Sequence, residues 1–266
     1  MQPASLFLGH GSPMTLIEPS PTRAFLAGLS GSFARPDAIL VVSAHWETVR
    51  PSLTASSLPG TIHDFGGFPE ELYRATYPVP GSPVLARRVA DLLGQAGLAA
   101  DLDPARGLYH GAWIPLAIAW PAARIPVVQL SLMAGKDAAA HLALGRALRP
   151  LARDNVLVVG SGNLTHNLRE AMGWPQSGGR GDNGWAETFA RAMGAAVLAG
   201  DEAALADWET AMPHARRAHP SPEHLLPLFV AFGAGGGAAT RIHDAMELGN
   251  LSMAAFAFAP APLPGN

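Results

Sequence analysis

Histidine is the residue type whose placement in this chain points to chemistry. The sequence holds ten histidines and no cysteine. Three of the histidines, His10, His45 and His166, come within a few residues of the end of a short apolar segment. Neutral imidazole is the commonest metal ligand, and histidine-rich sites suit zinc or iron. These positions therefore predict a site that binds a divalent metal ion.

The apolar segments before these histidines are typical of buried strands. They are Leu6–Leu8, Ile39–Val42 and Val156–Val159, and they alternate with stretches whose apolar residues recur at helical spacing. The alternation predicts a central, mostly parallel (mixed) sheet flanked by helices, in a single α/β domain that spans residues 1–266. Ligands bind at the carboxyl ends of the strands in such sheets, so we expect the three histidines to converge there.

Two helices are predicted from their N-terminal residues. Ser20 and Ser82 are candidate N-caps, and each precedes a proline suited to the first helical position. Gly97 can end the second of these helices. The apolar side chains expected near one face of that helix are Val84, Val89, Leu92 and Leu93. Two glycine-rich stretches, 176–184 and 233–237, read as mobile loops.

A further metal ligand has to come from another element, because neighbouring residues of a strand point to opposite faces. The segment HPSPEHLLPLF offers His219, Glu223 and His224. Pro222 is expected to open a helix that carries Glu223 and His224 in its first turn and is distorted by Pro227. The positive end of that helix would keep His224 neutral. Glu223 and His224 lie about 100° apart around a helix, so one ion is not expected to bind both. Spacing alone does not choose among the three candidates.

Composition excludes several classes of protein. The net charge of −3 provides no basic surface for nucleic acid, and no apolar run approaches the roughly 18 residues of a membrane helix. The N-terminus lacks the features of a signal peptide, and the absence of cysteine suits a reducing compartment, so we expect a cytoplasmic protein. GHGSP lacks the Gly-Lys-Ser/Thr end of a phosphate loop, and GSGN lacks the spacing of a nucleophile elbow.

An ordered set of short motifs resembles one enzyme family. The motifs are LFLGHGSPM, VVSAHWE, TIHDFGGFPEELY, HGAW, PVVQLS, GSGNLTHNLRE and PSPEHLLPL, and the similarity runs from about Leu6 to Met253. Together they are similar to extradiol ring-opening dioxygenases of the DOPA 4,5-dioxygenase type, in the class III superfamily that includes protocatechuate 4,5-dioxygenase. The resemblance implies an oxidoreductase that cleaves the aromatic ring of a DOPA-like catechol with O2.

The same resemblance implies the residues of the site. His10, His45 and His224 would hold the metal, with His166 beside them as acid and base or as a fourth ligand. His63 and His110 would line the active site, although hydrogen bonds that anchor their loops explain these two about equally well.

The metal and its outer partners follow from the same comparison. The broader superfamily places two histidines and a glutamate around non-haem Fe(II), whereas this branch has a histidine at the third position. The resemblance implies Fe(II) as the catalytic metal. Three histidines also suit Zn(II), which is expected as a bound species. Asp64 and Glu47 are candidates to orient a ligand, since metal-bound imidazoles usually donate their other N–H to a carboxylate or carbonyl.

Two alternatives stay open. A zinc-dependent hydrolase would use metal-bound water as its nucleophile and His166 as general base. A non-catalytic metal-binding interaction protein would hold the metal without turnover. The sequence fixes neither the catechol, nor the position of ring cleavage, nor whether the chain forms a homo-oligomer.

Overall fold

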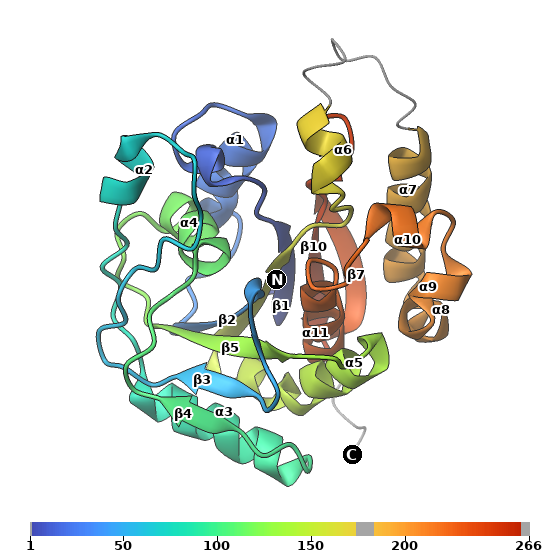
Figure 1. Cartoon of the computed structure of the whole chain (residues 1–266). Coiled ribbons are helices and arrows are strands. Elements are labelled where there is room, and N and C mark those ends of the chain that lie inside the picture. The colour runs from blue at the N-terminus through green and yellow to red at the C-terminus, as the bar shows by residue number, and fades with distance from the viewer. Residues whose placement is uncertain (1, 174–183, 262–266) are drawn as a thin grey trace.

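The computed structural model describes residues 2–173 and 184–261, which form one eight-stranded sheet and a separate two-stranded ladder (Figure 1). The order in the large sheet is β4-β3-β5-β2-β6-β1-β10-β7. Its strands are β1 (Ser5–Gly9), β2 (Ala38–Thr48), β3 (Ser52–Thr54), β4 (Asp101–Asp103), β5 (Val127–Met133), β6 (Val156–Gly162), β7 (Gly236–His243) and β10 (Ala255–Pro260); the ladder pairs β8 (Met246–Glu247) with β9 (Leu251–Ser252).

The four central strands β5, β2, β6 and β1 are parallel, and antiparallel pairings of β3, β10 and β7 make the sheet mixed. The predicted fold class, a mostly parallel sheet flanked by helices, is therefore confirmed. The short outer strands β3 and β4 and the glycine-rich strand β7 were missed, because they carry too few apolar residues to give a strand signal.

Helices cover both faces of the sheet (Figure 1). They are α1 (Pro21–Gly28), α2 (Glu70–Arg74), α3 (Pro83–Gln95), α4 (His110–Ala119), α5 (Ala138–Ala147), α6 (Leu168–Gly173), α7 (Gly184–Ala199), α8 (Glu202–Ala206), α9 (Trp208–Ala211), α10 (Ala215–Ala218) and α11 (Leu226–Gly235). Within the described ranges, no helix is both long enough and apolar enough to cross a membrane.

Alternation along β2 explains the two helical layers. Leu40 and Val42 face a core that includes α3, α5, α7 and α11, whereas Ile39 and Val41 face a core that includes α1 and α4. Successive side chains of a strand point to opposite faces, so a strand buried on both sides is apolar throughout. The continuous apolar run in the sequence thus reflects the central position of β2.

The predicted N-caps are confirmed, and one buried position is corrected. The side chains of Ser20 and Ser82 accept hydrogen bonds from backbone N–H groups at the starts of α1 and α3. Val84 is 72% exposed, contrary to prediction, because it lies about 140° around the helix from Val89. Leu85 occupies the buried position instead.

The stretch 233–237 is not a loop. Gly233 to Gly235 complete α11, and Gly236, with φ of +74°, turns the chain into β7. Gly233 is needed inside the helix because a Cβ there would collide with the backbone of Leu142 in α5. Of the other predicted loop, residues 176–183 lie outside the described part of the chain.

The helix expected from Pro222 begins later, at Leu226. Glu223 and His224 lie in the turn that precedes it. Pro227 consequently sits in the first turn of α11, where its missing N–H leaves no hydrogen bond unmade, and it does not distort the helix.

Candidate active site

Imidazoles from five separate segments gather near the carboxyl ends of the parallel strands. His10 follows β1, His45 lies near the end of β2, His110 begins α4, His166 follows β6 and His224 precedes α11. The ring centroid of His45 lies 5.0 Å from those of His10 and His224, which are 5.5 Å apart. His110 is 3.9 Å from His45, and His166 stacks on His224 at 3.4 Å. We call these five residues the histidine cluster.

Two glycines allow the backbone to come this close to the rings. A Cβ at Gly111, in the first turn of α4, would lie 2.6 Å from Cδ2 of His45. A Cβ at Gly162, the last residue of β6, would collide with the carbonyl of His224. The glycines in the motifs HGAW and GSGN thus keep room for the neighbouring histidines.

Three rings of the cluster have a hydrogen-bond acceptor facing Nδ1. The His110 ring lies 2.9 Å from Asp64 Oδ2, and the His224 ring lies 2.9 Å from Glu223 Oε1. His10 Nδ1 lies 3.0 Å from the Ser161 hydroxyl, which donates its own proton to the carbonyl of Gly111. Because a carboxylate, and here the hydroxyl, can only accept, each of these Nδ1 atoms carries the proton.

With the proton on Nδ1, the free lone pair of each ring lies on Nε2. Nε2 of His10 and Nε2 of His45 lie only 3.1 Å apart. Nδ1 of His45 lies 3.5 Å from the Asp64 carboxylate, which favours a proton on that nitrogen as well. Two lone pairs at this distance repel one another unless a cation lies between or beside them. Ligand nitrogens of one tetrahedral zinc ion are separated by about 3.3 Å, so the residues fit a divalent metal.

The potential ligand atoms fall into two groups. Those of His10, His45 and His110 all lie within 4.8 Å of one another, and so do those of His166, Glu223 and His224. The structure thus brings together every histidine predicted at the metal and adds His110 to them. Glu223, an open candidate from the sequence, faces the ring of His224.

Burial keeps the rings of His10, His45 and His224 uncharged. Desolvation, and then the neighbouring imidazoles, hold the pKa values of His10 and His224 well below the ordinary value. Burial, followed by the charge that His110 would carry, lowers the pKa of His45 to about 3 despite the opposing effect of Asp64. Neutral rings are the form that binds a metal, so these three rings are in that form at neutral pH.

His166 differs from the other rings in its surroundings. Burial, then the nearby His219, lowers its pKa to about 4, and it too is neutral at neutral pH. Among the described residues, no hydrogen-bond partner faces its ring nitrogens. Its imidazole is therefore available to a bound molecule.

The structure does not bring His63 and His219 into the cluster. His63 Nε2 lies 2.9 Å from the carbonyl of Ala75, and Phe65 contacts both His63 and His110. His219 Nε2 lies 3.0 Å from the carbonyl of Leu164. Each ring thus holds a backbone carbonyl in place, and the ring of Phe65 lies between His63 and His110 of the cluster.

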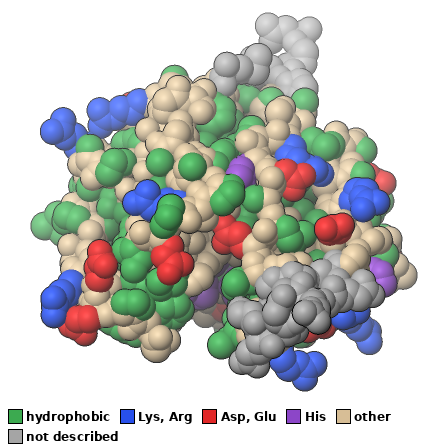
Figure 2. All heavy atoms as spheres, turned by 90° about the horizontal axis from the view of Figure 1, so that it is seen from above, with side chains coloured by type: hydrophobic (Ala, Val, Ile, Leu, Met, Phe, Trp, Pro, Cys, Tyr) green, Lys and Arg blue, Asp and Glu red, His purple; other side chains and the backbone are tan. Residues whose placement is uncertain are grey.

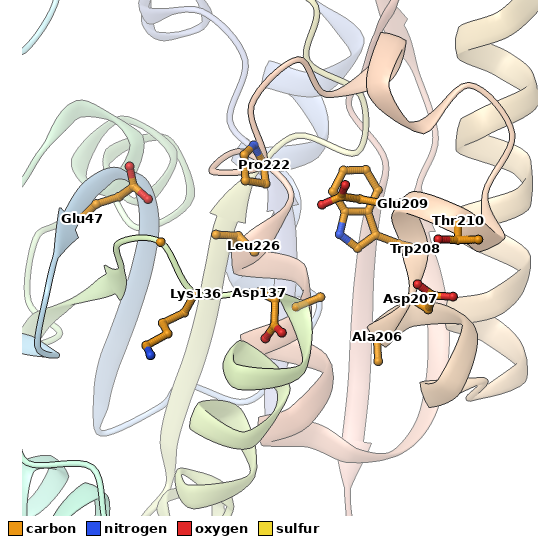
Figure 3. A pocket seen from close by; sticks show the side chains of 12 residues that line it. Glu47, Lys136, Asp137, Ala206, Asp207, Trp208, Glu209, Thr210, Pro222 and Leu226 are labelled. Atoms are coloured by element: carbon orange, nitrogen blue, oxygen red, sulfur yellow. The ribbon is translucent and has the colours of Figure 1, made fainter.

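A cavity of about 500 Å³ is lined by residues close in the chain to His45 and His224, but by none of the five histidines of the cluster. Glu47, two residues after His45, stands on one side, and Trp208 and Glu209 of α9 stand on the other, with Lys136 between them (Figure 3). Seen from above, histidine and acidic side chains appear among hydrophobic ones near the middle of the face (Figure 2). The volume suits a small organic molecule.

Comparison with known proteins supplies the family. Residues 20–258 match the model of the catalytic LigB subunit of aromatic ring-opening dioxygenase. The chain belongs to this family. It is 41% identical to a 4,5-DOPA dioxygenase extradiol of Beta vulgaris over 96% of both chains, and 40% identical to one of Escherichia coli (strain K12) over 94% of this chain and 92% of that one. A crystal structure of an uncharacterized Escherichia coli K12 protein matches with a TM-score of 0.79 at 34% identity, covering 97% of this chain and 100% of that one.

Membership confirms the predicted enzyme class, an oxidoreductase of the aromatic ring-opening dioxygenase family. The family is metal-dependent, in agreement with the cluster of histidines and glutamate. The comparisons do not favour the zinc-dependent hydrolase or the non-catalytic scaffold. Sequence reasoning missed Ser161 as the partner of His10, because a serine in a buried strand gives no signal of its own.

Proposed function

We propose that this member of the ring-opening dioxygenase family cleaves a catechol with a DOPA-like side chain, by the extradiol reaction with O2. Several relatives that align along almost the whole chain are named 4,5-DOPA dioxygenase extradiol. The observation that carries the proposal is the convergence of neutral imidazoles at the carboxyl ends of the parallel strands.

We assign the metal to His10, His45 and His224. Three imidazoles bound through Nε2 to one ion, at about 2.0–2.1 Å, have ring centroids roughly 5 Å apart. The separations of 5.0, 5.0 and 5.5 Å in this trio agree with that arrangement. His110, at 3.9 Å from His45, is too close to it and is placed outside the ligand set. Fe(II) is the proposed catalytic ion, and Zn(II) is an ion that the same three ligands accept.

When bound, the metal would hold the catechol and O2 together and pass electrons between them. The chain's own contribution is to orient these molecules and move protons. His166 is neutral, and none of the described residues offers its ring nitrogens a hydrogen bond. It is the proposed base for a catechol hydroxyl and the proposed acid for the later return of that proton. A fourth-ligand role for His166 is the alternative. His110 and, through Phe65, His63 are proposed to line the substrate site.

Oxygen uptake tests the proposal directly. The protein is first loaded with Fe(II) under anaerobic conditions and then given DOPA and O2. We expect it to consume one O2 for each DOPA and to form a yellow ring-opened product. Protein loaded with Zn(II) serves as the control and should consume none. Conversion of substrate without O2 uptake would instead indicate a hydrolase, and metal retention with no conversion would indicate a scaffold.

A further inference from the structure

Two carboxylates face the cluster from behind the rings. Asp64 accepts hydrogen bonds from the backbone N–H of His110 at 2.8 Å and from its ring at 2.9 Å, and it lies 3.5 Å from Nδ1 of His45. Glu223 accepts a hydrogen bond from Nδ1 of His224 and is itself held by the hydroxyl of Ser221 at 3.1 Å. Asp64 therefore lies behind the proposed ligand His45, and Glu223 lies behind the proposed ligand His224.

These carboxylates lie in partly buried surroundings, where charge is screened less than at the surface. The side chains of Asp64 and Glu223 are 18% and 23% exposed.

The charge balance of the site depends on them. Three neutral imidazoles bring no negative charge to a divalent cation, whereas two histidines and a glutamate would bring one. Asp64 and Glu223 together carry two negative charges directly behind the rings, which equals the charge of the ion. An all-histidine ligand set lacks negative charge, and the carboxylates that contact the rings supply it without binding the metal.

We propose that Asp64 and Glu223 are positioning residues that set the metal affinity of this site without binding the metal. They hold the protons of the rings on Nδ1 and balance the charge of the ion. The inference rests on the proposed ligand set, and it goes beyond that set by assigning a role to residues outside it.

An amide in place of Asp64 should reverse the tautomer of His110. In Asp64→Asn, the amide oxygen can still accept from the backbone N–H of His110, which places the NH2 group opposite Nδ1. A ring nitrogen that faces a donor has to be the unprotonated one, so the proton moves to Nε2. Glu223→Gln differs, because Oε1 alone accepts from both Ser221 and Nδ1 of His224. The amide oxygen can keep both bonds, so this variant removes the negative charge behind His224 and leaves its tautomer unchanged.

The test uses the full-length, metal-free protein and Zn(II) as the probe. Nitrogen NMR of the histidine rings in metal-free protein should show unprotonated Nε2 in the wild type and protonated Nε2 at His110 in Asp64→Asn. Chelator competition should show a 10–100-fold loss of Zn(II) affinity in Asp64→Asn and also in Glu223→Gln. Asp91→Asn and Glu18→Gln, exposed carboxylates elsewhere, are the matched controls and should bind as the wild type does.

The outcomes separate the inference from the proposed function. An unchanged His110 tautomer in Asp64→Asn, or Zn(II) affinity within twofold of the wild type in both variants, would overturn the inference while leaving the ligand set intact. Failure of the wild type to bind Zn(II) would instead overturn the proposed metal centre itself. Should Asp64→Asn fail to fold, Glu223→Gln carries the prediction for Zn(II) affinity from a more exposed turn.

Discussion

At the scale of the residue, the site depends on which ring nitrogen of each histidine carries the proton. Ser161, Asp64 and Glu223 each face an Nδ1 atom, and burial keeps the rings of His10 and His224 neutral. A histidine constrained in this way presents a single lone pair in a fixed direction. His166 differs, since none of the described residues offers its ring nitrogens a hydrogen bond, and it is the ring proposed to act on the substrate.

Alanine variants should separate ligands from the acid–base residue. We expect His10→Ala and His45→Ala to lose most of the bound metal, because each removes a proposed ligand. His166→Ala should keep much of its metal and lose turnover by about 10²–10⁴-fold. Metal content after dialysis, measured beside oxygen uptake, checks both statements. Equal metal loss in all three variants would place His166 in the ligand set.

The depressed pKa values also predict how stability depends on pH. Burial lowers the pKa of His166 and His219 to about 4 and of His45 to about 3, whereas the unfolded chain titrates near 6.5. Between these values the unfolded state binds more protons than the folded state, so the free energy of unfolding falls as the pH falls. This contribution is fully present above pH 6.5 and is lost progressively toward pH 4 and below.

Urea unfolding of the metal-free protein at a series of pH values checks this prediction. The free energy of unfolding should be level from pH 8 to 7 and should decline below pH 6.5. A constant value from pH 8 down to pH 5 would contradict the neutral, buried state of these rings.

At the scale of the element, the first turn of α4 closely approaches the strands that carry the site. It is buried along nearly its whole length, and its first turn carries both His110 and Gly111. The glycine lets the helix backbone pass beside the rings of His10 and His45. Packing of this helix thus determines the space left for the ion.

Gly111→Ala should therefore damage both folding and metal binding. The new methyl group would lie 2.6 Å from the ring of His45 and 3.2 Å from that of His10, so these rings or the helix must move. We expect a loss of about 1–3 kcal/mol in the free energy of unfolding, together with weaker Zn(II) binding.

Gly94→Ala, in α3, is the matched control. No neighbouring atom of the described residues lies within 4 Å of the Cβ that it adds, so it should raise stability by roughly 0.5–1 kcal/mol through helix propensity alone. Chemical denaturation of both variants makes the comparison. Unchanged stability and Zn(II) affinity in Gly111→Ala would show that the helix can shift without cost.

At the scale of the whole molecule, the proposed ligands tie together the first strand, a central strand and the segment before α11. They lie at positions 10, 45 and 224, so the unfolded chain cannot hold them around one ion. Binding free energy therefore becomes folding free energy.

Metal addition should accordingly raise the melting temperature. Zn(II) at about 100 times its Kd should add about 2.7 kcal/mol, which corresponds to roughly 5–10 °C for a chain of this size. A chelator should reverse the shift, and the double variant His10→Ala/His45→Ala should show none. Calorimetry measures all three. An equal shift in the double variant would place the stabilising ion elsewhere.

The sequence by itself determined the central strands, the caps of α1 and α3, the order of the histidine-bearing segments and the family they indicate. Those features depend on local patterns, which neighbouring residues carry. Only the tertiary structure decided that α11 starts at Leu226, that Glu223 faces the ring of His224, and that Asp64 serves His110 and His45 together. The physical reason is that the two nitrogens of an imidazole are distinguished by what packs against them. Those partners lie as far apart in the chain as His10 and Ser161.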